Sequence, residues 1–404
     1  NFVEVGVVLP IFQTFFYEIP PQLEAAIAIG QRVAVPFGGR RAIGYVLSFS
    51  RKAPDMEIKQ VEAVLDPNPI LSPTMLAFLK WISKYYHYPI GEVIKAALPS
   101  GVNVDGGRRL FLTEEGRRQL EKEAKENLLS WQKMILIVTR RRRNGVTLKE
   151  LQKACEMKIT DRRLQQMIAL GWLSTSATNI ASRVKPKRSE PIGVEEKGVQ
   201  LPLSDGQQRV LRTVKGAISM GGFSPFLLHG ITGSGKTEVY IRAIHETLKK
   251  GRQAIYLVPE ISLTPQLIGR LQVHFRGSIA VLHSHLTEGE RYDGWLRIKR
   301  GEVSIAIGAR SAIFAPFERL GLIIVDEEHD NSFKQDSQFK YNARDIALVR
   351  GRFEKATVIL GSATPSVDSF YNVTKKKIMY LTLPSRVQNI PLPGDCEYKI
   401  TLEE

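Results

Sequence analysis

The stretch Gly230-Ile231-Thr232-Gly233-Ser234-Gly235-Lys236-Thr237 decides the fold of this chain. It directly follows an apolar run, Pro225 to His229, and precedes a helical pattern that opens at Glu238. Glycines at these positions let backbone N–H groups curl around a phosphate at a helix N-terminus, where unpaired donors and the helix dipole both favour anions. The pattern predicts a phosphate-binding loop in which Lys236 reaches the β- and γ-phosphates of a nucleotide and Thr237 ligates Mg²⁺.

A second motif supplies carboxylates. The apolar run 322–325 predicts a buried strand that delivers Asp326, Glu327 and Glu328 at its C-terminal end, where open α/β sheets bind ligands. We expect Asp326 to hold the metal and Glu327 to polarise the attacking water, because a carboxylate beside a Mg²⁺-bound phosphate accepts a proton as the nucleophile forms. The alternative is a solvated acidic loop, and the phosphate-binding loop upstream favours the catalytic interpretation.

Short apolar runs alternate with helical patterns around both motifs. The runs span residues 226–229, 254–259, 280–283, 303–308, 322–326 and 357–360. Alternation of this kind predicts a doubly wound parallel sheet. We therefore expect an α/β domain with a central parallel sheet, built around the phosphate-binding loop, over residues 201–385.

Composition favours nucleic acid as the partner. The 404 residues carry a formal net charge of +16 with a pI near 9.7, and a phosphate backbone binds Lys and Arg favourably because counterions are released. The alternative is a basic protein that is merely soluble. No run approaches the roughly 18 uninterrupted apolar residues of a membrane span, so we expect no membrane partner, and no secretory signal pattern opens the chain. With only Cys155 and Cys396, we expect no zinc ligands and a reducing cytoplasm.

The first 105 residues predict a small β-rich domain with a helical tail. We expect a hairpin in which two strands flank the turn Gly38-Gly39. The hairpin carries Arg32, Arg40 and Arg41 beside Phe37 and Tyr45, the mixture of cations and aromatic faces that single-stranded nucleic acid prefers. The alternative is a solvated hairpin whose aromatic residues belong to the core.

Residues 106–182 predict a winged-helix domain of three helices and a short terminal hairpin. The four arginines at 140–143 would bind the phosphates of a nucleic acid or, alternatively, form the cationic last turn of a helix. Residues 183–200 lose apolar periodicity, which is typical of a linker. The tail 386–404 has no assignment.

Four segments together carry a family resemblance. They are residues 257–266 (Leu-Val-Pro-Glu-Ile-Ser-Leu-Thr-Pro-Gln), Gly308-Ala309-Arg310-Ser311-Ala312, Asp326-Glu327-Glu328-His329 and Gly361-Ser362-Ala363-Thr364-Pro365. In this order and spacing they resemble the superfamily 2 helicases, specifically the bacterial primosomal replication-restart helicases, the primosomal protein N′ family. The resemblance extends to residues 32–44, which resemble that family's domain for the 3′ end of a nascent strand, and to residues 81–99 after it. It implies a RecA-like P-loop helicase lobe over residues 201–385.

The resemblance assigns roles to further residues. Gln207 would contact the base of the nucleotide, with Gln208 as an equally placed alternative. Another group would line the track of single-stranded DNA: Thr264, Gln266, Arg310 and Ser311. Ser362 and Thr364 would couple the nucleotide site to that track. We expect His329 to join this coupling, in preference to metal binding or a pH switch.

A segment after the carboxylates resembles the loop, rich in aromatic residues, that senses DNA in this family. Its members are Phe333, Lys334, Gln335, Phe339, Tyr341, Asn342 and Arg344. The segment also has a physical case of its own, because aromatics interleaved with Lys334, Lys340 and Arg344 offer stacking and phosphate contact beside the water-polarising carboxylate. DNA binding would then shift Glu327. The alternative is that the aromatics anchor a surface loop to its own core.

The function that the resemblance implies is ATP-dependent, 3′-to-5′ unwinding or translocation of DNA, with recognition of stalled or branched replication forks and initiation of primosome assembly for replication restart. The implied cofactors are ATP and Mg²⁺, and zinc belongs only to the C-terminal part of the family's full-length proteins. The implied partners are forked and single-stranded DNA, single-stranded DNA-binding protein and other primosome components. We expect a cytoplasmic, nucleoid-associated monomer. Two rivals remain: a non-unwinding DNA translocase, and a DNA-structure-binding protein with a vestigial nucleotide site.

The chain departs from the family in two respects. Where the family usually shows Phe-Asp-Tyr, this chain has Phe15-Phe16-Tyr17, so the aspartate expected to read the terminal nucleotide is replaced by Phe16. The second helicase lobe and the cysteine-rich zinc region do not occur within the 404 residues. An arginine from a second lobe is typically worth about 10³ to 10⁵ in the rate of phosphoryl transfer. We therefore expect these residues to bind Mg²⁺-ATP or ADP, to hydrolyse ATP poorly and not to unwind DNA.

Overall fold

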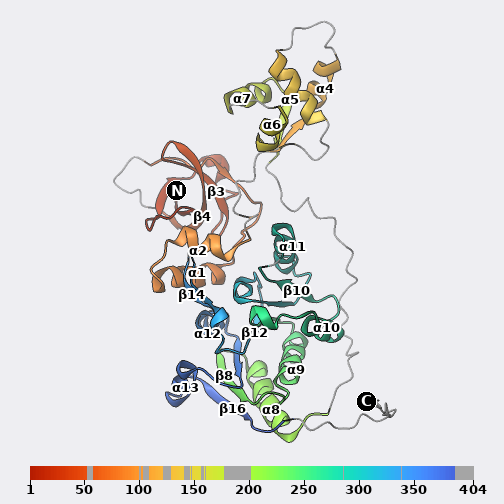
Figure 1. Cartoon of the computed structure of the whole chain (residues 1–404). Helices are drawn as coiled ribbons and strands as arrows, with labels where there is room; N and C mark the ends of the chain where they lie inside the picture. Colours follow the sequence, from red (N-terminus) through yellow and green to blue (C-terminus); the bar gives the residue numbers. More distant parts are fainter. Residues whose placement is uncertain are drawn as a thin grey trace, which may run out of the picture. The chain divides into compact units, whose positions relative to one another are not determined.

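The computed structural model describes residues 1–51, 58–99, 102, 109–121, 129–140, 146, 148–155, 159, 161–176, 202–284, 286–337 and 339–386. The chain divides into two compact units, one made mainly of residues from Asn1 to Arg188 and the other mainly of residues from Ser189 on, and each is described by itself. Figure 1 labels their helices and strands. The predicted linker at 183–200, the tail beyond Arg386 and the arginines at 141–143 lie outside the described residues.

The first unit opens with a five-stranded sheet in the order β2-β1-β4-β3-β5. Its strands are β1 (Phe2–Val7), β2 (Phe15–Glu18), β3 (Arg32–Phe37), β4 (Arg40–Ser50) and β5 (Ala63–Val64), and the 3-10 helix η1 spans Pro21–Leu23. Neighbouring strands run antiparallel. Val3, Val5 and Val7 alternate along β1 and are buried, as the period of two in a strand requires.

The predicted hairpin is confirmed. Strands β3 and β4 pair with Phe37 opposite Arg40, and Gly38 and Gly39 form the connection between them. The two glycines have φ angles of 55° and 73°. Two successive residues with positive φ are what a type I′ turn needs, and glycine adopts this conformation at no steric cost.

The helical tail of this domain consists of α1 (Pro73–Tyr85) and α2 (Ile90–Ala97). The Ser72 side chain accepts a hydrogen bond from the Met75 backbone N–H, so it caps the start of α1. The apolar residues Leu76, Leu79 and Ile82, spaced three apart along α1, are buried and lie on one face of the helix.

The region expected to be a winged helix differs from the prediction in its strands. It contains β6 (Arg109–Leu112), α4 (Glu114–Glu121), α5 (Ser130–Arg140), α6 (Leu148–Cys155), α7 (Asp161–Ala169) and β7 (Leu173–Ser176). Strand β7 pairs antiparallel with β6, a strand before the helices that the prediction did not include. The expected terminal hairpin stays a prediction, since residues 177–201 lie outside the described residues. The apolar residues of this region form a cluster that shares no member with the cluster of the five-stranded sheet. The winged-helix assignment itself stays a prediction.

The second unit contains a seven-stranded sheet in the order β10-β11-β9-β12-β15-β8-β16, and every neighbouring pair is parallel. The strands are β8 (Ser224–Gly230), β9 (Gln253–Leu257), β10 (Ile279–Leu282), β11 (Ile305–Gly308), β12 (Leu320–Asp326), β15 (Thr357–Ser362) and β16 (Met379–Leu383). All six predicted runs form strands, so the predicted parallel sheet is confirmed. The prediction omitted the edge strand β16.

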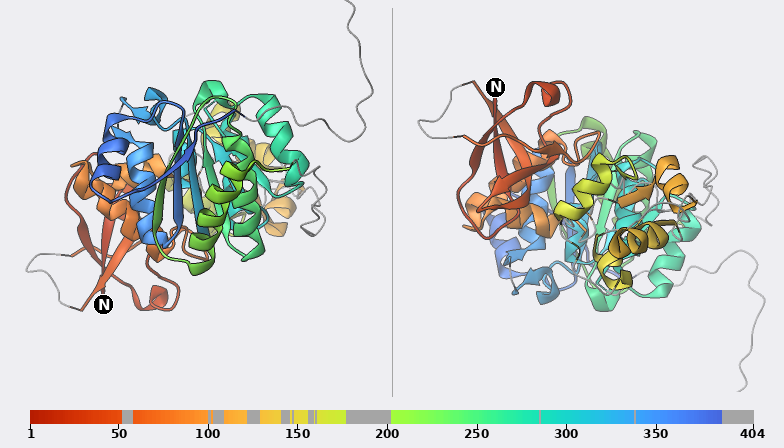
Figure 2. Two further views of the ribbon diagram at one scale, coloured as in Figure 1. Left: turned by 90° about the horizontal axis from the view of Figure 1, so that it is seen from below. Right: turned by 90° about the horizontal axis from the view of Figure 1, so that it is seen from above.

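Helices cover both faces of this sheet. The helices between residues 202 and 386 are α8 (Asp205–Met220), α9 (Lys236–Lys249), η3 (Glu260–Ser262), α10 (Pro265–His274), α11 (Glu288–Lys299), η4 (Arg310–Phe314), η5 (Asn331–Phe333), α12 (Ala343–Glu354) and α13 (Val367–Thr374). Within α11, residues Glu288–Leu296 belong to the first unit. Helix α8 contacts β15 and β16 and α9 contacts β9 and β12, whereas α12 lies on the other side of the strands and contacts β8, β12 and β15 (Figure 2). A small antiparallel pair, β13 (Lys334–Gln335) and β14 (Tyr341–Asn342), precedes α12.

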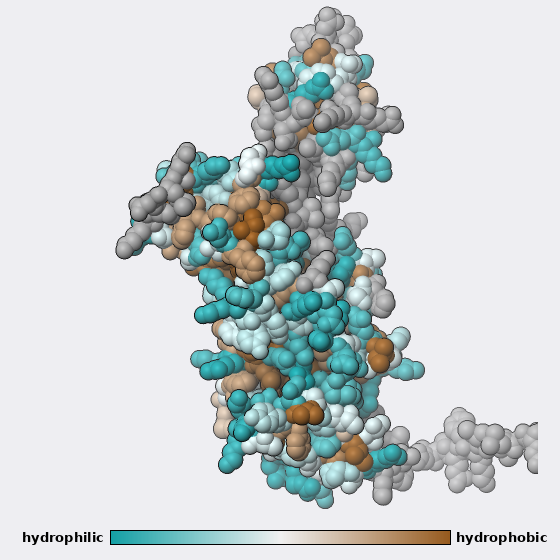
Figure 3. All heavy atoms as spheres, turned by 60° about the vertical axis from the view of Figure 1, so that its left-hand side comes forward, coloured by the Kyte–Doolittle hydropathy of each residue, from teal (hydrophilic) through white to brown (hydrophobic). Residues whose placement is uncertain are grey.

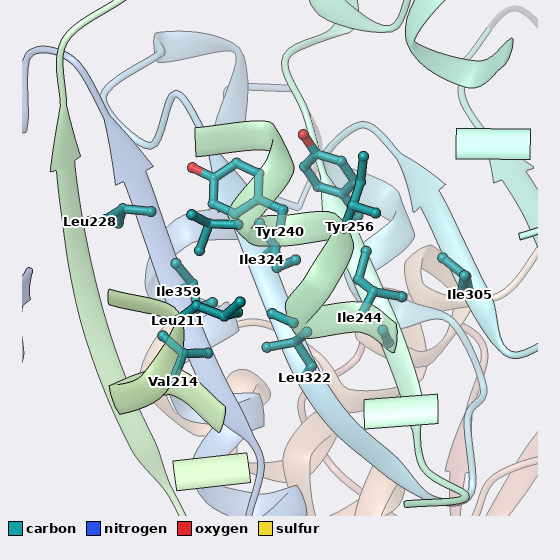
Figure 4. Packing of buried hydrophobic residues seen from close by; sticks show 14 of the residues in the cluster. Leu211, Val214, Leu228, Tyr240, Ile244, Tyr256, Ile305, Leu322, Ile324 and Ile359 are labelled. Atoms are coloured by element: carbon teal, nitrogen blue, oxygen red, sulfur yellow. The ribbon is translucent and has the colours of Figure 1, made fainter. Parts of the chain in front are cut away.

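The core of this unit lies between the sheet and helices α8 to α10. Leu322, Ile324 and Ile359 alternate along β12 and β15 and pack against Val214 of α8 and Ile244 of α9 (Figure 4). All five residues are fully buried. Because parallel sheets carry helices on both faces, their strands are apolar on both sides, which explains the continuous apolar runs in the sequence.

Hydrophilic residues cover most of the face drawn in Figure 3, and hydrophobic residues appear on it in small groups. Single exposed apolar side chains are ordinary on protein surfaces. No helix among the residues that the structure describes is long and apolar enough to cross a membrane.

We expect Ile359→Ala to lower the free energy of unfolding of this unit by about 2 to 5 kcal/mol, because the substitution leaves a cavity among fully buried neighbours. Urea denaturation followed by circular dichroism measures the change. The control is Val273→Ala on α10, where the side chain is 55% exposed and the expected change stays within about 0.5 kcal/mol. Equal effects of the two substitutions would contradict this assignment of the core.

Candidate nucleotide and DNA site

The glycine-rich segment connects the end of β8 at Gly230 to the start of α9 at Lys236. Gly233 and Gly235 have φ angles of 81° and 78°, a region that side chains with a Cβ rarely adopt. A Cβ on Gly230 would lie 2.6 Å from Ser234 Oγ, so this position also needs glycine. The loop therefore folds tightly over the N-terminus of α9, and helix N-termini are places where backbone N–H groups commonly bind phosphate.

The Lys236 side chain lies between the loop and the acidic motif. Its Nζ donates a hydrogen bond to the Gly230 carbonyl oxygen at 2.8 Å and lies 3.8 Å from Glu327 Oε1. Lys236, at the start of α9, thus faces Glu327, which follows β12, although β15 lies between β8 and β12 in the sheet. This is the arrangement in which an ammonium group can contact the terminal phosphates of a nucleotide.

Asp326 is held by three donors. Tyr240 Oη of α9 donates to Oδ1 at 3.1 Å, Tyr256 Oη of β9 donates to Oδ2 at 3.0 Å, and the Glu327 backbone N–H donates to Oδ1 at 3.1 Å. Burial and the neighbouring charge of Glu327 raise the pKa of Asp326, whereas the two hydroxyls and Lys236 act to lower it. Burial, with the Asp326 charge next in size, raises the pKa of both tyrosines well above 10, so both phenols remain protonated donors.

The donor set suits Mg²⁺. Thr237 opens α9 and Asp326 ends β12, and both offer hard oxygen atoms. No group of three or more His, Cys, Asp or Glu side chains within the described ranges is placed to hold a metal ion. At nucleotide sites Mg²⁺ is usually bound by one or two side chains together with phosphate oxygens and water.

His329 connects Glu327 to the Gly361-Ser362-Ala363-Thr364-Pro365 motif. His329 Nδ1 lies 2.8 Å from Ser362 Oγ and 3.7 Å from Glu327 Oε2, and the Thr364 backbone N–H donates to Ser362 Oγ at 2.9 Å. Glu327 has a φ angle of 48°, which turns the chain sharply after β12. The contact that the predicted coupling needs is present, and the coupling itself stays a prediction.

Glu328 has a structural role that the sequence did not reveal. It is 1% exposed, and its carboxylate accepts hydrogen bonds from Ser366 N, Ser366 Oγ and Ser369 Oγ at 2.7 to 2.9 Å. Arg344 Nη1 lies 3.4 Å from the same carboxylate and donates to Ser366 Oγ at 2.8 Å. Glu328 therefore joins the acidic motif to the start of α13. Ser366 is visible in the sequence as a helix cap, but no pattern pairs it with Glu328.

Gln207 holds the phosphate-binding loop. It is 3% exposed and forms a reciprocal capping box with Ser204 at the start of α8. Its Nε2 donates to the carbonyl oxygens of Ser234 and Gly235 at 3.2 and 3.4 Å. The alternative residue, Gln208, donates to the Leu203 carbonyl oxygen at the surface. Contact of Gln207 with a nucleotide base stays a prediction.

The residues expected along the DNA track follow β9 and β11, and therefore lie at the same edge of the sheet as the acidic motif. Thr264 caps α10 through its hydroxyl, while Gln266 and Ser311 are exposed. Arg310 Nη1 lies 3.3 Å from the carbonyl oxygens of Ser332 and Lys334 and donates to them. Arg310 thus joins the segment after β11 to the loop rich in aromatic residues.

The aromatic residues of that loop face inward. Phe333, Phe339 and Tyr341 are 1%, 3% and 7% exposed, and Phe339 stacks on Tyr341 with ring centroids 5.0 Å apart. The expectation that these rings offer free stacking faces is wrong, because the apolar rings gain more from burial in their own core. Lys334 and Lys340 are exposed, and Lys334 Nζ lies 3.6 Å from Oδ1 of the exposed Asp336.

Arg344 was expected to contact DNA, but its guanidinium is also turned inward. It lies within hydrogen-bonding distance of Glu328, Ser366, Asp345 and Asp368. Asn342 accepts from the Arg344 backbone N–H and so caps α12. The loop is therefore tied to both the acidic motif and α13.

In the N-terminal sheet, Arg32 and Tyr45 are buried and cannot face nucleic acid as expected. Arg32 Nε and Nη2 donate to both oxygens of Asp66 at 2.8 and 2.7 Å, and Nη1 donates to the Val102 carbonyl oxygen. Phe37 packs edge-on against Phe15 with ring centroids 5.0 Å apart. The exposed cations of the hairpin are Arg40 and Arg41. A buried Arg needs a partner, and the distant Asp66 supplies it.

Comparison with known proteins adds two family matches. Residues 4–99 match the 3′ DNA-binding domain of PriA, and residues 205–373 match the DEAD/DEAH box helicase family. The replication restart protein PriA of Bacillus subtilis (strain 168) is 33% identical to the chain, over 97% of this chain and 57% of that protein. The chain belongs to the PriA family over the length that it spans.

The PriA protein of Haemophilus influenzae is also 33% identical, over 96% of this chain and 52% of that protein. The chain thus spans about half the length of the curated relatives that it matches. Among solved structures, RecG bound to a three-way DNA junction is 23% identical, with a TM-score of 0.37 over 47% of this chain and 24% of that chain.

We expect Glu328→Gln to lower the free energy of unfolding by about 3 kcal/mol, because the substitution leaves Arg344 without its buried counter-charge. The matched control is Glu327→Gln, the same change one residue earlier at a side chain that is 35% exposed, where the expected loss stays within about 0.5 kcal/mol. Urea denaturation of both variants measures the difference. A Glu328→Gln chain as stable as Glu327→Gln would contradict the structural role of Glu328.

Proposed function

We propose that this chain is the nucleotide-binding and DNA-binding part of an ATP-dependent 3′-to-5′ DNA helicase or translocase. In this proposal the parent protein recognises stalled or branched replication forks and starts primosome assembly for replication restart. The cofactors are ATP and Mg²⁺. Forked and single-stranded DNA are the substrates, and single-stranded DNA-binding protein and other primosome components are the partners.

The observation that carries the proposal is the position of Lys236. Its ammonium group lies between the glycine-rich loop and Glu327, with Asp326 directly before Glu327. A nucleotide whose phosphates enter the loop would place its terminal phosphate against Lys236 and its metal between Thr237 and Asp326. Glu327 is then the group beside the reacting phosphate that can polarise water. Lys236, Thr237, Asp326 and Glu327 already lie at the same edge of the sheet, so these contacts with the nucleotide and the metal need no rearrangement of the strands.

Two further features support a link between this site and DNA. His329 contacts Ser362, and Arg310 contacts the loop that carries Lys334, so the edge that would bind nucleotide is continuous with the edge expected to bind DNA. DNA phosphates would bind the exposed cations Lys334 and Lys340. The exposed Arg40 and Arg41 would contribute a second phosphate-binding surface on the N-terminal domain.

We also propose that these 404 residues alone hydrolyse ATP slowly and do not unwind DNA. An arginine that stabilises the developing charge on the γ-phosphate typically contributes about 10³ to 10⁵ in rate, and the proposal places that arginine in a second helicase lobe. The DNA dependence of the hydrolysis distinguishes the parent activity from one rival, because the ATPase of a non-unwinding translocase would be stimulated equally by intact duplex and by forks.

We expect Lys236→Ala to weaken binding of a fluorescent ADP analogue with Mg²⁺ at least tenfold, since hydrogen bonds between charged groups contribute about 1.5 to 3 kcal/mol each. Titration of the chain at constant ionic strength measures the dissociation constant. Lys250→Ala, the same charge change at the far end of α9, serves as the control and leaves binding unchanged. If Lys236→Ala altered neither nucleotide binding nor any DNA-dependent activity, the site would be vestigial.

We expect Phe16→Asp to create a preference for forks with a free 3′ end. Phe16 lies on β2 and is 39% exposed, and a carboxylate there could accept a hydrogen bond from a terminal hydroxyl. The expected gain is about tenfold in affinity for a free over a blocked 3′ end, from one charged hydrogen bond. Phe49→Asp, at another exposed aromatic of the same sheet, controls for the added charge. A 3′-end preference already present in the unsubstituted chain would show that Phe16 does not remove it.

A further inference from the structure

Two buried tyrosines meet at the carboxylate of Asp326, and the proposed function gives them no role. Tyr240 comes from α9, behind the phosphate-binding loop, and Tyr256 comes from β9. Their rings are 5.7 Å apart at an interplanar angle of 65°, and both side chains are fully buried. Figure 4 shows them at one end of the core cluster, with their hydroxyl oxygens pointing away from the aliphatic residues.

Each hydroxyl binds a different oxygen of Asp326. Tyr240 donates to Oδ1 and Tyr256 donates to Oδ2. The Glu327 backbone N–H adds a second donor to Oδ1. Donors on both oxygens, from two separate elements, fix the rotation of the carboxylate about its Cβ–Cγ bond. The lone pairs that remain are then held in one direction.

The neighbouring strand leaves room for one of these hydroxyls. Gly361 of β15 pairs in register with Asp326 of β12, and a Cβ at position 361 would lie 1.7 Å from Tyr240 Oη. The glycine that opens the Gly361-Ser362-Ala363-Thr364-Pro365 motif therefore makes space for the hydroxyl of Tyr240. Phenylalanine would fill most of the same core volume without a polar atom that needs a partner, so packing alone does not account for the two hydroxyls.

We propose that Tyr240 and Tyr256 are positioning residues that hold the Asp326 carboxylate in the orientation required by the Mg²⁺ ion that accompanies the nucleotide. The inference rests on the proposed function of this site and deepens it. Hydrogen-bond partners of a metal-binding carboxylate set its orientation, and their loss typically lowers metal affinity by about 10- to 100-fold. Tyr240 also connects this carboxylate to the helix that begins with Lys236 and Thr237.

The test measures how strongly Mg²⁺ and nucleotide favour each other's binding. A fluorescent ADP analogue is titrated into the whole chain with Mg²⁺ and with EDTA, and the ratio of the two dissociation constants is the Mg²⁺-dependent gain. We expect Tyr240→Phe and Tyr256→Phe each to reduce this gain by about tenfold. The affinity in EDTA should stay the same, because the loop and Lys236 are unchanged.

The matched control is Tyr380→Phe, which removes a hydroxyl that contacts His229 at 2.7 Å in the same unit. It should leave the Mg²⁺-dependent gain unchanged. A purely structural role of the tyrosines would lower the stability of the variants without changing the gain. The same substitutions in an Asp326→Asn background should add no further loss, because the tyrosines act through that carboxylate.

The outcomes separate the two proposals. If the unsubstituted chain binds no nucleotide, the proposed function fails. If it binds nucleotide more tightly with Mg²⁺ and both tyrosine variants keep the full gain, the positioning role is overturned while the proposed function stands. Should Tyr240→Phe fail to fold, Tyr256→Phe decides the matter by itself, because its hydroxyl binds the other oxygen and is independent of Gly361.

Discussion

The common direction of seven strands is the constraint on which the rest of the second unit depends. Because every neighbouring pair is parallel, the segments after β8, β9, β11, β12 and β15 leave the sheet at one edge. The phosphate-binding loop and the acidic motif follow strands that are not neighbours, since β15 lies between them. Lys236 nevertheless reaches Glu327, and β15 contributes Gly361 and Ser362 to the space between.

Buried polar groups hold this edge in place. Glu328 collects donors from Ser366 and Ser369, so the acidic motif cannot move without disturbing the start of α13. Arg350 of α12 is fully buried and donates to the carbonyl oxygens of Ile313 and Ala315, which fixes the segment that begins with Arg310. Burial lowers the pKa of Arg350 to about 10. A buried charged group without a hydrogen-bond partner destabilises the folded state. The hydrogen bonds of Glu328 and Arg350 therefore favour the loop arrangement in which both groups are paired.

The two parts of the chain that were expected to bind DNA also contain buried residues that the sequence analysis placed at the surface. In the loop before α12, the aromatic rings lie inside and the lysines remain outside. In the N-terminal hairpin, Arg32 is paired with Asp66 inside, and Arg40 and Arg41 remain outside. A contact with phosphate needs only an exposed cation, whereas stacking on bases needs an exposed ring. In the loop before α12, the lysines are thus accessible to solvent and the aromatic rings are not.

The sequence by itself determined the elements whose signals are local. The hairpin turn follows from the φ freedom of Gly38 and Gly39, and six strands of the parallel sheet follow from continuous apolar runs. The positions of the glycine-rich loop and of the acidic motif could also be predicted, because each motif consists of consecutive residues that can be recognised in the sequence. The tertiary structure decided what depends on distant partners. Arg32 can be buried because Asp66 pairs with it, and Tyr341 packs in a core that includes Phe314. The orientation of the Asp326 carboxylate depends on hydrogen bonds from two tyrosines that are 86 and 70 residues away in the sequence. Sequence periodicity shows which face of a helix or strand is apolar. It does not show the partner of a buried polar group, because the desolvation of that group is offset by whichever donor or acceptor the packed chain places next to it.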